Sequence, residues 1–226
     1  MKFNYLKALF ILIVVFISKF GLAQVNEIKV KFIGNCGLYM TDGDLNIYVD
    51  FPYKSGAFNY MEYDESELDS IKENSIFIFT HKHPDHYSGK NMRKTLRKKN
   101  GKKYGKWNIS KLENLTDSTT GFSIQVFETK HRFSFRHYSY LITWHGKKIF
   151  LSGDTESADT ILKIGTIDWA FVPSWIVHDA NEKGMKIDAK MIGIYHLYPN
   201  EKVVNNSPDK IKVFDKQGET ISIYIE

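Results

Sequence analysis

The sequence predicts a layered domain that mixes β-strands with a few helices, of the α/β or α+β class. Short runs with strand composition recur along the chain, glycine-containing turns separate several of them, and only two segments have helical character. The 226 residues are 42% hydrophobic and 15% aromatic, which supports a packed core and excludes a disordered chain. Strands interspersed with occasional helices fit a single layered domain.

The first 23 residues are typical of a secretory signal peptide. A basic start precedes the apolar run Ala8–Ile17, and Gly21–Ala23 offers small residues for cleavage. The run is shorter than the about 20 residues that a membrane-spanning helix needs. We therefore expect an exported protein, periplasmic or secreted, whose domain spans 24–226; an uncleaved N-terminal anchor is the alternative. The only cysteine, Cys36, excludes an internal disulfide, and we expect it to be buried in packing.

The first half of the domain is predicted to begin with three strands. Ile28–Ile33 alternates apolar and basic residues, as a half-buried strand does. Asp42–Asp44 is a turn signal between strands at Leu38–Thr41 and Leu45–Asp50. Ser75–Thr80 is a continuous β-rich run, typical of a buried strand. The next segment is a predicted helix, Ser88–Asn100, followed by a glycine.

The second half is predicted to be mostly strands. These are Phe122–Thr129, Tyr138–Trp144, Lys148–Leu151, Trp169–Val172 and Ile192–Tyr195, with a short helix at Ala158–Ile164. The chain is predicted to end in a hairpin of Ile211–Phe214 and Thr220–Ile225 around Gln217–Gly218.

Four potential metal ligands follow the buried strand Ser75–Thr80 directly, in the segment His81-Lys82-His83-Pro84-Asp85-His86. Imidazole nitrogen and carboxylate oxygen are ligands that zinc accepts. In an extended segment His81 and His83 point the same way, and Pro84 makes the chain turn. A solvated histidine-rich loop is the alternative, but its position directly after a buried strand favours a metal site.

The H-x-H-x-D-H motif after a buried strand resembles the signature of the metallo-β-lactamase-fold hydrolases. The opening segments Phe32–Gly37 and Ile47–Asp50 are also similar to that family, and the similarity extends over nearly all of Ile28–Glu226. The resemblance implies the α+β fold of this family, a single-domain αββα sandwich with a two-metal site at one edge of the sheets.

The resemblance also implies seven ligands. His131 follows Phe122–Thr129, Asp154 follows the strand that ends at Leu151, and His196 ends the Ile192 strand. By this carry-over one metal takes His81, His83 and His131, the other takes Asp85, His86 and His196, and Asp154 bridges them. The expected cofactors are two divalent ions, zinc first, with manganese or iron as alternatives.

The function implied is that of an exported, dinuclear metal-dependent hydrolase in which a metal-bridging hydroxide attacks the substrate. Asp85 is the expected catalytic residue, placed to hold the nucleophile and pass a proton. The Gly153–Thr155 pattern resembles the branch that contains glyoxalase II, ribonuclease Z, the ascorbate-6-phosphate lactonase and the N-acylphosphatidylethanolamine phospholipase. The compact opening and its continuation Asp50–Pro52 resemble the last two most, so an ester, lactone or phosphodiester is expected. A β-lactam is the alternative substrate; a diiron oxidoreductase and a non-catalytic binding protein are the alternatives from other classes.

Two local features bear on the substrate, which we expect to be a small or lipid-like, anionic molecule. Aromatic residues crowd the segment Phe51–Tyr63 and form either an apolar wall beside the metals or a cap on the core. Ten basic residues and no acid lie in Lys90–Lys111, whereas the net charge of the whole chain is only +5. This stretch is either a solvated helix face or a contact for an anionic substrate or membrane surface. Export disfavours nucleic acid, and the sequence leaves the oligomeric state open.

Three histidines remain outside the predicted ligand set. His145 lies beside a turn and is expected to be exposed. His137 is expected in strand-end packing or on the surface. His178 lies in a predicted loop after Trp169–Ser174, where it either rims the site and contacts substrate or is simply a surface residue.

Overall fold

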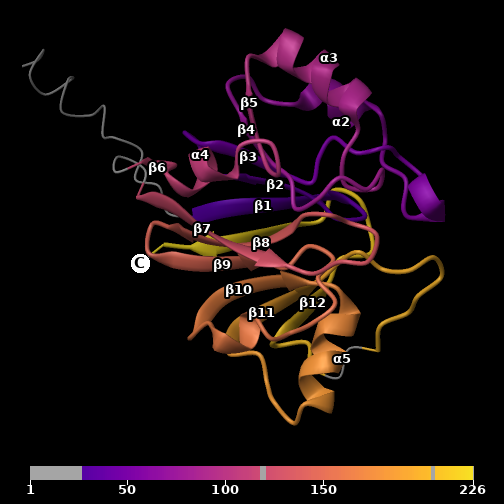
Figure 1. The fold of residues 1–226 in the computed structure, drawn as a ribbon, viewed down its shortest axis with the longest axis vertical. Helices are drawn as coiled ribbons and strands as arrows, with labels where there is room; N and C mark the ends of the chain where they lie inside the picture. Colours follow the sequence, from indigo (N-terminus) through magenta and orange to yellow (C-terminus); the bar gives the residue numbers. More distant parts are fainter. Residues whose placement is uncertain (1–26, 118–120, 205–206, 226) are drawn as a thin grey trace, which may run out of the picture.

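Two β-sheets stacked face to face form the centre of the molecule, which we describe from a computed structural model (Figure 1). The structure describes residues 27–117, 121–204 and 207–225. The predicted signal peptide, 1–23, lies outside the described residues. Within the described part, no helix is both long and apolar enough to cross a bilayer.

The first sheet has the strand order β13-β1-β2-β3-β4-β5. Its strands are β1 (Glu27–Gly34), β2 (Gly37–Thr41), β3 (Asn46–Val49), β4 (Ile76–Ile78), β5 (Lys102–Tyr104) and β13 (Thr220–Tyr224). Because β1 to β3 form an antiparallel meander and β4 and β5 continue parallel to β3, strands β1, β3 and β4 all end at the same edge.

The second sheet has the order β12-β11-β10-β9-β8-β7-β6. Its strands are β6 (Thr116–Asp117), β7 (Phe122–Thr129), β8 (His137–Trp144), β9 (Lys147–Leu151), β10 (Ile167–Val172), β11 (Ala189–Ile194) and β12 (Ile211–Val213). Strands β9 to β12 are parallel, and β7 runs in their direction because β8 is antiparallel to both of its neighbours. The carboxyl ends of β7, β9, β10 and β11 therefore share one edge.

Helices cover the outer face of each sheet. They are α2 (Ser66–Ser70), α3 (Gly89–Lys99) and α5 (Ser174–Glu182), with 3₁₀ turns η1 (Ala57–Asn59) and η2 (Ile161–Lys163) elsewhere in the chain. Helix α4 (Ile109–Glu113) instead packs into the core between the sheets through Leu112. Met92 of α3 packs with Phe77 on the first sheet, and Ile176 of α5 packs with Val172 on the second. Figure 1 shows α3 and α5 on opposite sides of the paired sheets, so the predicted αββα sandwich is confirmed.

The core lies between the sheets and follows the strand alternation. Val30 and Leu38 of the first sheet pack with Ile142 and Phe171 of the second. Along β10 the neighbours of Phe171, Ala170 and Val172, face α5 instead. This period of two explains why the buried strands of the sequence are apolar on both faces.

Three predicted elements differ from the structure. The last two strands do not form a hairpin, because β12 pairs with β11 in the second sheet whereas β13 pairs with β1 in the first. The predicted loop that carries His178 is the helix α5, which begins directly after Pro173. The helix predicted over Ala158–Ile164 is reduced to η2.

Candidate metal centre

All seven predicted ligand residues meet where the carboxyl ends of the strands from both sheets come together. The first sheet contributes the loop after β4, and the second contributes the loops after β7, β9 and β11. Their side chains form two groups whose potential ligand atoms all lie within 4.8 Å of one another: His81, His83 and His131 in one, and Asp85, His86, Asp154 and His196 in the other. The centre therefore lies across the seam between the sheets.

The first group consists of histidines alone. His131 Nε2 lies 3.1 Å from His83 Nδ1, and the ring of His81 packs 4.5 Å from that of His83 and 4.7 Å from that of His131. His81 is buried, whereas the other two are half-buried, so this group lies nearer to solvent.

The second group is fully buried. His86 Nε2 lies 3.1 Å from His196 Nε2, and His196 Nε2 lies 3.3 Å from Asp85 Oδ2. Three donors from two sheets thus converge on one point.

Asp154 connects the two groups. Its Oδ2 lies 3.0 Å from His86 Nε2 and 3.2 Å from His196 Nε2. The same oxygen lies 3.8 Å from His131 Nε2 and 3.9 Å from His81 Nε2. One carboxylate therefore reaches both groups, as a bridging ligand must.

Several buried polar atoms of the centre have no hydrogen-bond partner, which is the observation that tests whether metal fits. They include His81 Nε2, Asp85 Oδ1 and Asp154 Oδ1. Unpaired buried polar atoms are rare in folded proteins because each costs free energy. Imidazole nitrogens and carboxylate oxygens are ligands of divalent metals such as zinc. The donor set therefore fits divalent cations.

The electrostatics of the centre also favour a cation. Burial, together with the neighbouring His86, lowers the pKa of His81 well below its ordinary value, so that its imidazole is neutral. Burial acts to raise the pKa of Asp154, but His196 and His86 outweigh it and hold that pKa well below the usual range. Burial likewise opposes protonation of His196, yet Asp154 and Asp85 raise its pKa to about 9. The carboxylates thus draw positive charge into a buried site.

Comparisons with known proteins bear on the fold. Neither protein-family models nor curated protein sequences gave a match. Among solved structures the chain resembles the metallo-β-lactamase fold protein YhfI from Bacillus subtilis (TM-score 0.61, 17% identity, 87% of this chain and 100% of that chain). It also resembles Igni18, a metallo hydrolase from Ignicoccus hospitalis (TM-score 0.60, 15% identity, 87% and 98%).

The chain has the metallo-β-lactamase fold. A third similar structure is a variant of CmlA, a diiron β-hydroxylase from Streptomyces venezuelae, with a TM-score of 0.56 and 12% identity over 92% of this chain and 56% of that chain. The fold is therefore shared by proteins with different chemistry, and the choice between them rests on the site.

Asp50, which the sequence did not single out as a site residue, orients one of the predicted ligands, His86. It follows β3, and its Oδ2 lies 2.9 Å from His86 Nδ1. Thr80 donates its backbone N–H to Oδ1 (2.8 Å) and its hydroxyl to Oδ2 (2.7 Å). With Nδ1 engaged in this way, Nε2 of His86 faces the second group. Carboxylates that bind the far nitrogen of a ligand histidine are common in metal sites.

His137 is buried and supports the loop of Asp154, which is more than the strand-end packing expected of it. The backbone N–H of Asp154 donates to His137 Nε2 (2.9 Å), so Nδ1 carries the ring proton and donates to Thr129 Oγ1 (2.7 Å). Burial lowers the pKa of His137 to about 3, consistent with a neutral ring. Gly153 precedes Asp154 at φ +55°, and a Cβ there would lie 2.7 Å from His137 Nε2.

The predictions for His178, His145 and Cys36 have different outcomes. His178 does not join the centre, because it lies on α5 and pairs with Glu182 at 3.1 Å on the exposed surface. His145 is not exposed as predicted but is half-buried, with Nε2 2.8 Å from Asp42 Oδ2. Cys36 is buried, as predicted; burial raises the pKa of its thiol, which donates to the backbone oxygen of Asp85 (3.1 Å).

The aromatic residues of Phe51–Tyr63 do not all have the same role: some cap the core, and one lies beside the centre. Phe51, Tyr53 and Tyr63 are buried and pack on the first sheet, so they cap the core. Phe58 is exposed. Only Tyr60 reaches the centre, where its ring lies 4.5 Å from the ring of His196.

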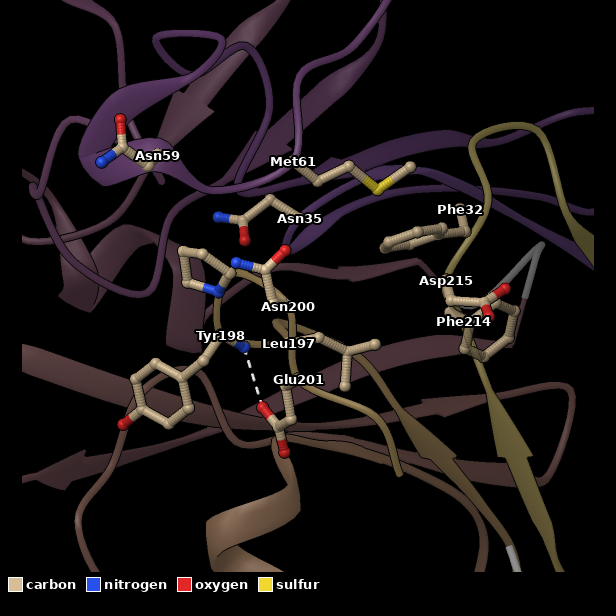
Figure 2. A pocket seen from close by; sticks show the side chains of 11 residues that line it. Phe32, Asn35, Asn59, Met61, Leu197, Tyr198, Asn200, Glu201, Phe214 and Asp215 are labelled. Carbon is tan, nitrogen blue, oxygen red and sulfur yellow. Dashed lines mark hydrogen bonds between the residues drawn. The ribbon is translucent and has the colours of Figure 1, made fainter. Parts of the chain in front are cut away.

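A cavity of about 320 Å³ opens over the centre and is lined by Tyr60, His131, Arg132, Asp154, Glu156, Trp175 and Tyr198. A wider cavity, of about 760 Å³, shares His131, Arg132 and Glu156 with it and extends to Phe135. Another, of about 430 Å³, shares Tyr198 with the first and is bounded by Asn35 and by the loop whose Tyr198 N–H donates to Glu201 (Figure 2).

The basic stretch Lys90–Lys111 covers α3, β5 and the start of α4, and most of its cationic side chains are exposed. It approaches the histidine motif at Trp107. Lys103 Nζ lies 3.8 Å from the centre of that ring, and Nζ of Lys82, which stands between His81 and His83, lies 5.9 Å from it.

Proposed function

We propose that this protein is a hydrolase that uses two divalent metal ions, zinc being the expected metal. The position of Asp154 carries the proposal, because its carboxylate reaches both groups of ligand-competent side chains. His81, His83 and His131 would hold one ion, and Asp85, His86 and His196 the other. Two such ions supply an activated water molecule and positive charge for the substrate oxygen.

Asp85 is the residue of this chain that we assign to proton transfer. Its Oδ2 is engaged by His196, whereas Oδ1 is buried and unpaired and can accept a hydrogen bond from water. Burial acts to raise the pKa of Asp85, but His196 and His86 lower it overall, so the carboxylate is ionised and able to take a proton.

We propose a carboxyl ester, lactone or phosphodiester as the substrate. The Gly153–Thr155 and Asp50–Pro52 sequences support this choice, because they resemble the branch of the ascorbate-6-phosphate lactonase and the N-acylphosphatidylethanolamine phospholipase. A β-lactam is the alternative substrate. The similarity to CmlA keeps a diiron oxidoreductase as the second candidate function.

Metal analysis and mutation of two ligands test the function. We expect two zinc ions per purified chain, and His83→Ala and Asp154→Ala should each lose metal and all hydrolysis. His178→Ala, on the exposed face of α5, is the matched control and should retain both. Retention of metal and activity by His83→Ala or Asp154→Ala would contradict the assignment, and two iron ions with redox activity would favour the second candidate.

A panel of carboxyl esters, lactones, β-lactams and phosphodiesters tests the substrate class. Hydrolysis of the β-lactams alone would contradict the proposed ester, lactone or phosphodiester and would favour the β-lactam alternative.

We also propose export to the periplasm or the medium, supported by the signal-like sequence of 1–23. Recovery of the protein only from the cytoplasmic fraction of cells would contradict it. The exposed lysines of Lys90–Lys111 support contact with an anionic substrate or membrane surface, and binding to anionic vesicles that persists when these lysines are replaced would argue against their role.

A further inference from the structure

Three aromatic rings from distant parts of the chain stand together beside the metal centre. Tyr60 follows η1, Trp175 lies in the first turn of α5, and Tyr198 follows β11. The rings of Tyr60 and Trp175 lie 4.5 Å and 5.7 Å from the ring of His196. Tyr198 lies 6.2 Å from Tyr60 and 5.3 Å from Trp175. We call these three residues the aromatic wall.

Hydrogen bonds fix the ring of Trp175 and the backbone of Tyr198. Trp175 Nε1 donates to the backbone oxygen of Thr155 (2.9 Å), which fixes the indole relative to the Asp154 loop. Glu201 accepts from the hydroxyl of Ser174 (2.5 Å) and from the backbone N–H of Tyr198 (2.8 Å), so one carboxylate ties the two loops together. The wall is therefore already formed before any substrate binds.

The aromatic wall lines the cavity of about 320 Å³ together with Arg132, Glu156, Asp154 and His131. This volume is at the lower end of the range of ligand pockets, and fits a ring with a few attached atoms. The wall rings are 5.3 and 6.2 Å apart and so touch one another, which leaves no space between them for a ligand. A ligand can therefore pack against the rings but not between them.

The aromatic wall lies close to the second group of predicted ligands, and this distance determines which part of a substrate contacts the wall. Because Tyr60 and Trp175 contact the ring of His196, a group stacked on the wall lies within a few bonds of an atom bound at the second group. A flat unsaturated ring gains more from such a face than a puckered ring of the same size, since more of its atoms touch and its quadrupole is complementary.

We propose that the aromatic wall selects substrates in which a flat unsaturated group, such as an aryl ring, adjoins the bond that is hydrolysed. This inference rests on the hydrolase function proposed above and names the class of substrate for the same site. Arylcarboxylic and arylphosphoric esters meet this description.

Binding of two matched acids tests the proposal. Benzoate and cyclohexanecarboxylate have the same charge and carbon count, and differ in flatness. We expect zinc-loaded protein to bind benzoate about tenfold more tightly, with quenching of tryptophan fluorescence. Trp175→Leu should remove both the preference and the quenching, whereas Trp107→Leu, the matched control outside the aromatic wall, should retain the preference.

Tyr198→Leu is the second variant, because about half of that side chain is exposed (52%) and its replacement should not impair folding. It should reduce the benzoate preference severalfold. Equal affinities for the two acids in the wild type, or an unchanged preference in both Trp175→Leu and Tyr198→Leu, would overturn the inference.

Hydrolysis of ethyl benzoate and ethyl cyclohexanecarboxylate separates this inference from the proposed function. If both esters are cleaved at equal kcat/KM by a zinc-containing protein, the hydrolase stands and the wall selects nothing. If the protein holds no metal and cleaves neither, the hydrolase fails. The neutral pair benzyl alcohol and cyclohexylmethanol then still tests the wall by fluorescence titration, with equal affinities overturning it.

Discussion

Asp50 determines which nitrogen of His86 faces the candidate centre, because its Oδ2 lies 2.9 Å from His86 Nδ1 while two hydrogen bonds from Thr80, at 2.7 and 2.8 Å, hold its carboxylate. We predict that Asp50→Asn lowers zinc affinity about 10- to 100-fold, because an amide has one acceptor oxygen for three donors. Competition with a chromogenic chelator measures this. Asp69→Asn, exposed on α2, should leave the affinity unchanged; unchanged affinity in Asp50→Asn itself would show that His86 needs no such support.

Gly153 permits the close approach of the Asp154 loop to His137 and Thr80. We predict that Gly153→Ala destabilises the fold by about 2–4 kcal/mol, since it adds left-handed strain to a Cβ packed 2.7 Å from His137. Urea unfolding measures the loss.

Gly146→Ala is the matched control, since Gly146 also has a positive φ (+78°) but nothing lies within 4 Å of the added Cβ. It should cost only about 1–2 kcal/mol of strain. Equal losses in the two variants would contradict the role given to packing around Gly153.

The four ligand-competent residues of His81–His86 stand out in the sequence because they cluster directly after an apolar strand. His131, Asp154 and His196 were predicted only through the resemblance to the metallo-β-lactamase-fold hydrolases. The supporting residues have no such pattern. His137 acts on Asp154 through the fold of β8 beside β9, and Asp50 meets His86 only because β3 and β4 are parallel neighbours. Contacts of this kind depend on strand pairing, which a single sequence does not reveal.

Most strand positions were predicted, except those of β5 and β6, and the pairing of β2 with β3 around Asp42–Asp44 is confirmed. The pairing predicted for the last two strands is wrong. The segments of β12 and β13 have clear strand composition and a glycine turn between them, which is the usual signature of a hairpin. Each strand instead completes the edge of a different sheet, where Ile223 and Phe214 join the common core. Helix α5 was missed although Pro173 before its first residue is a known helix start signal.

Helix α3 begins immediately after the histidine motif, and its start is capped by Ser88, whose hydroxyl accepts from the backbone N–H of Asn91 (3.3 Å). We predict that Ser88→Ala lowers the free energy of unfolding by about 0.5–2 kcal/mol. Chemical denaturation measures it, and zinc content should stay the same. Ser110→Ala, exposed on α4, should have no effect; an equal loss there would refute the capping role.

At the scale of the whole molecule, metal should contribute much of the stability. With free zinc about a thousandfold above its Kd, binding stabilises the folded state by about 4 kcal/mol. For a domain of this size we predict that chelation lowers the Tm by about 8–16 °C. Calorimetry with and without chelator measures it. The Asp154→Ala protein should show almost no shift, and a wild type that shows none would refute metal binding.

The basic residues of the molecule are concentrated in one region. Ten basic residues without an acid lie in Lys90–Lys111, so the modest net charge of +5 conceals a cationic region on α3, β5 and α4. This region reaches the histidine motif at Trp107, because the ring of Trp107 lies close to both Lys103 and Lys82, and Lys82 belongs to that motif.

The position of the centre between the two sheets affects how the sheets are held together. Of the seven predicted ligands, four follow a strand of the first sheet and three follow strands of the second, so ions shared through Asp154 would join layers that are otherwise held mainly by apolar packing. Cys36 is the only cysteine, so the chain cannot close a covalent loop of its own. In the metal-loaded protein proposed here, the ions act as a reversible cross-link over 81–196, and the layers cannot separate until they are released.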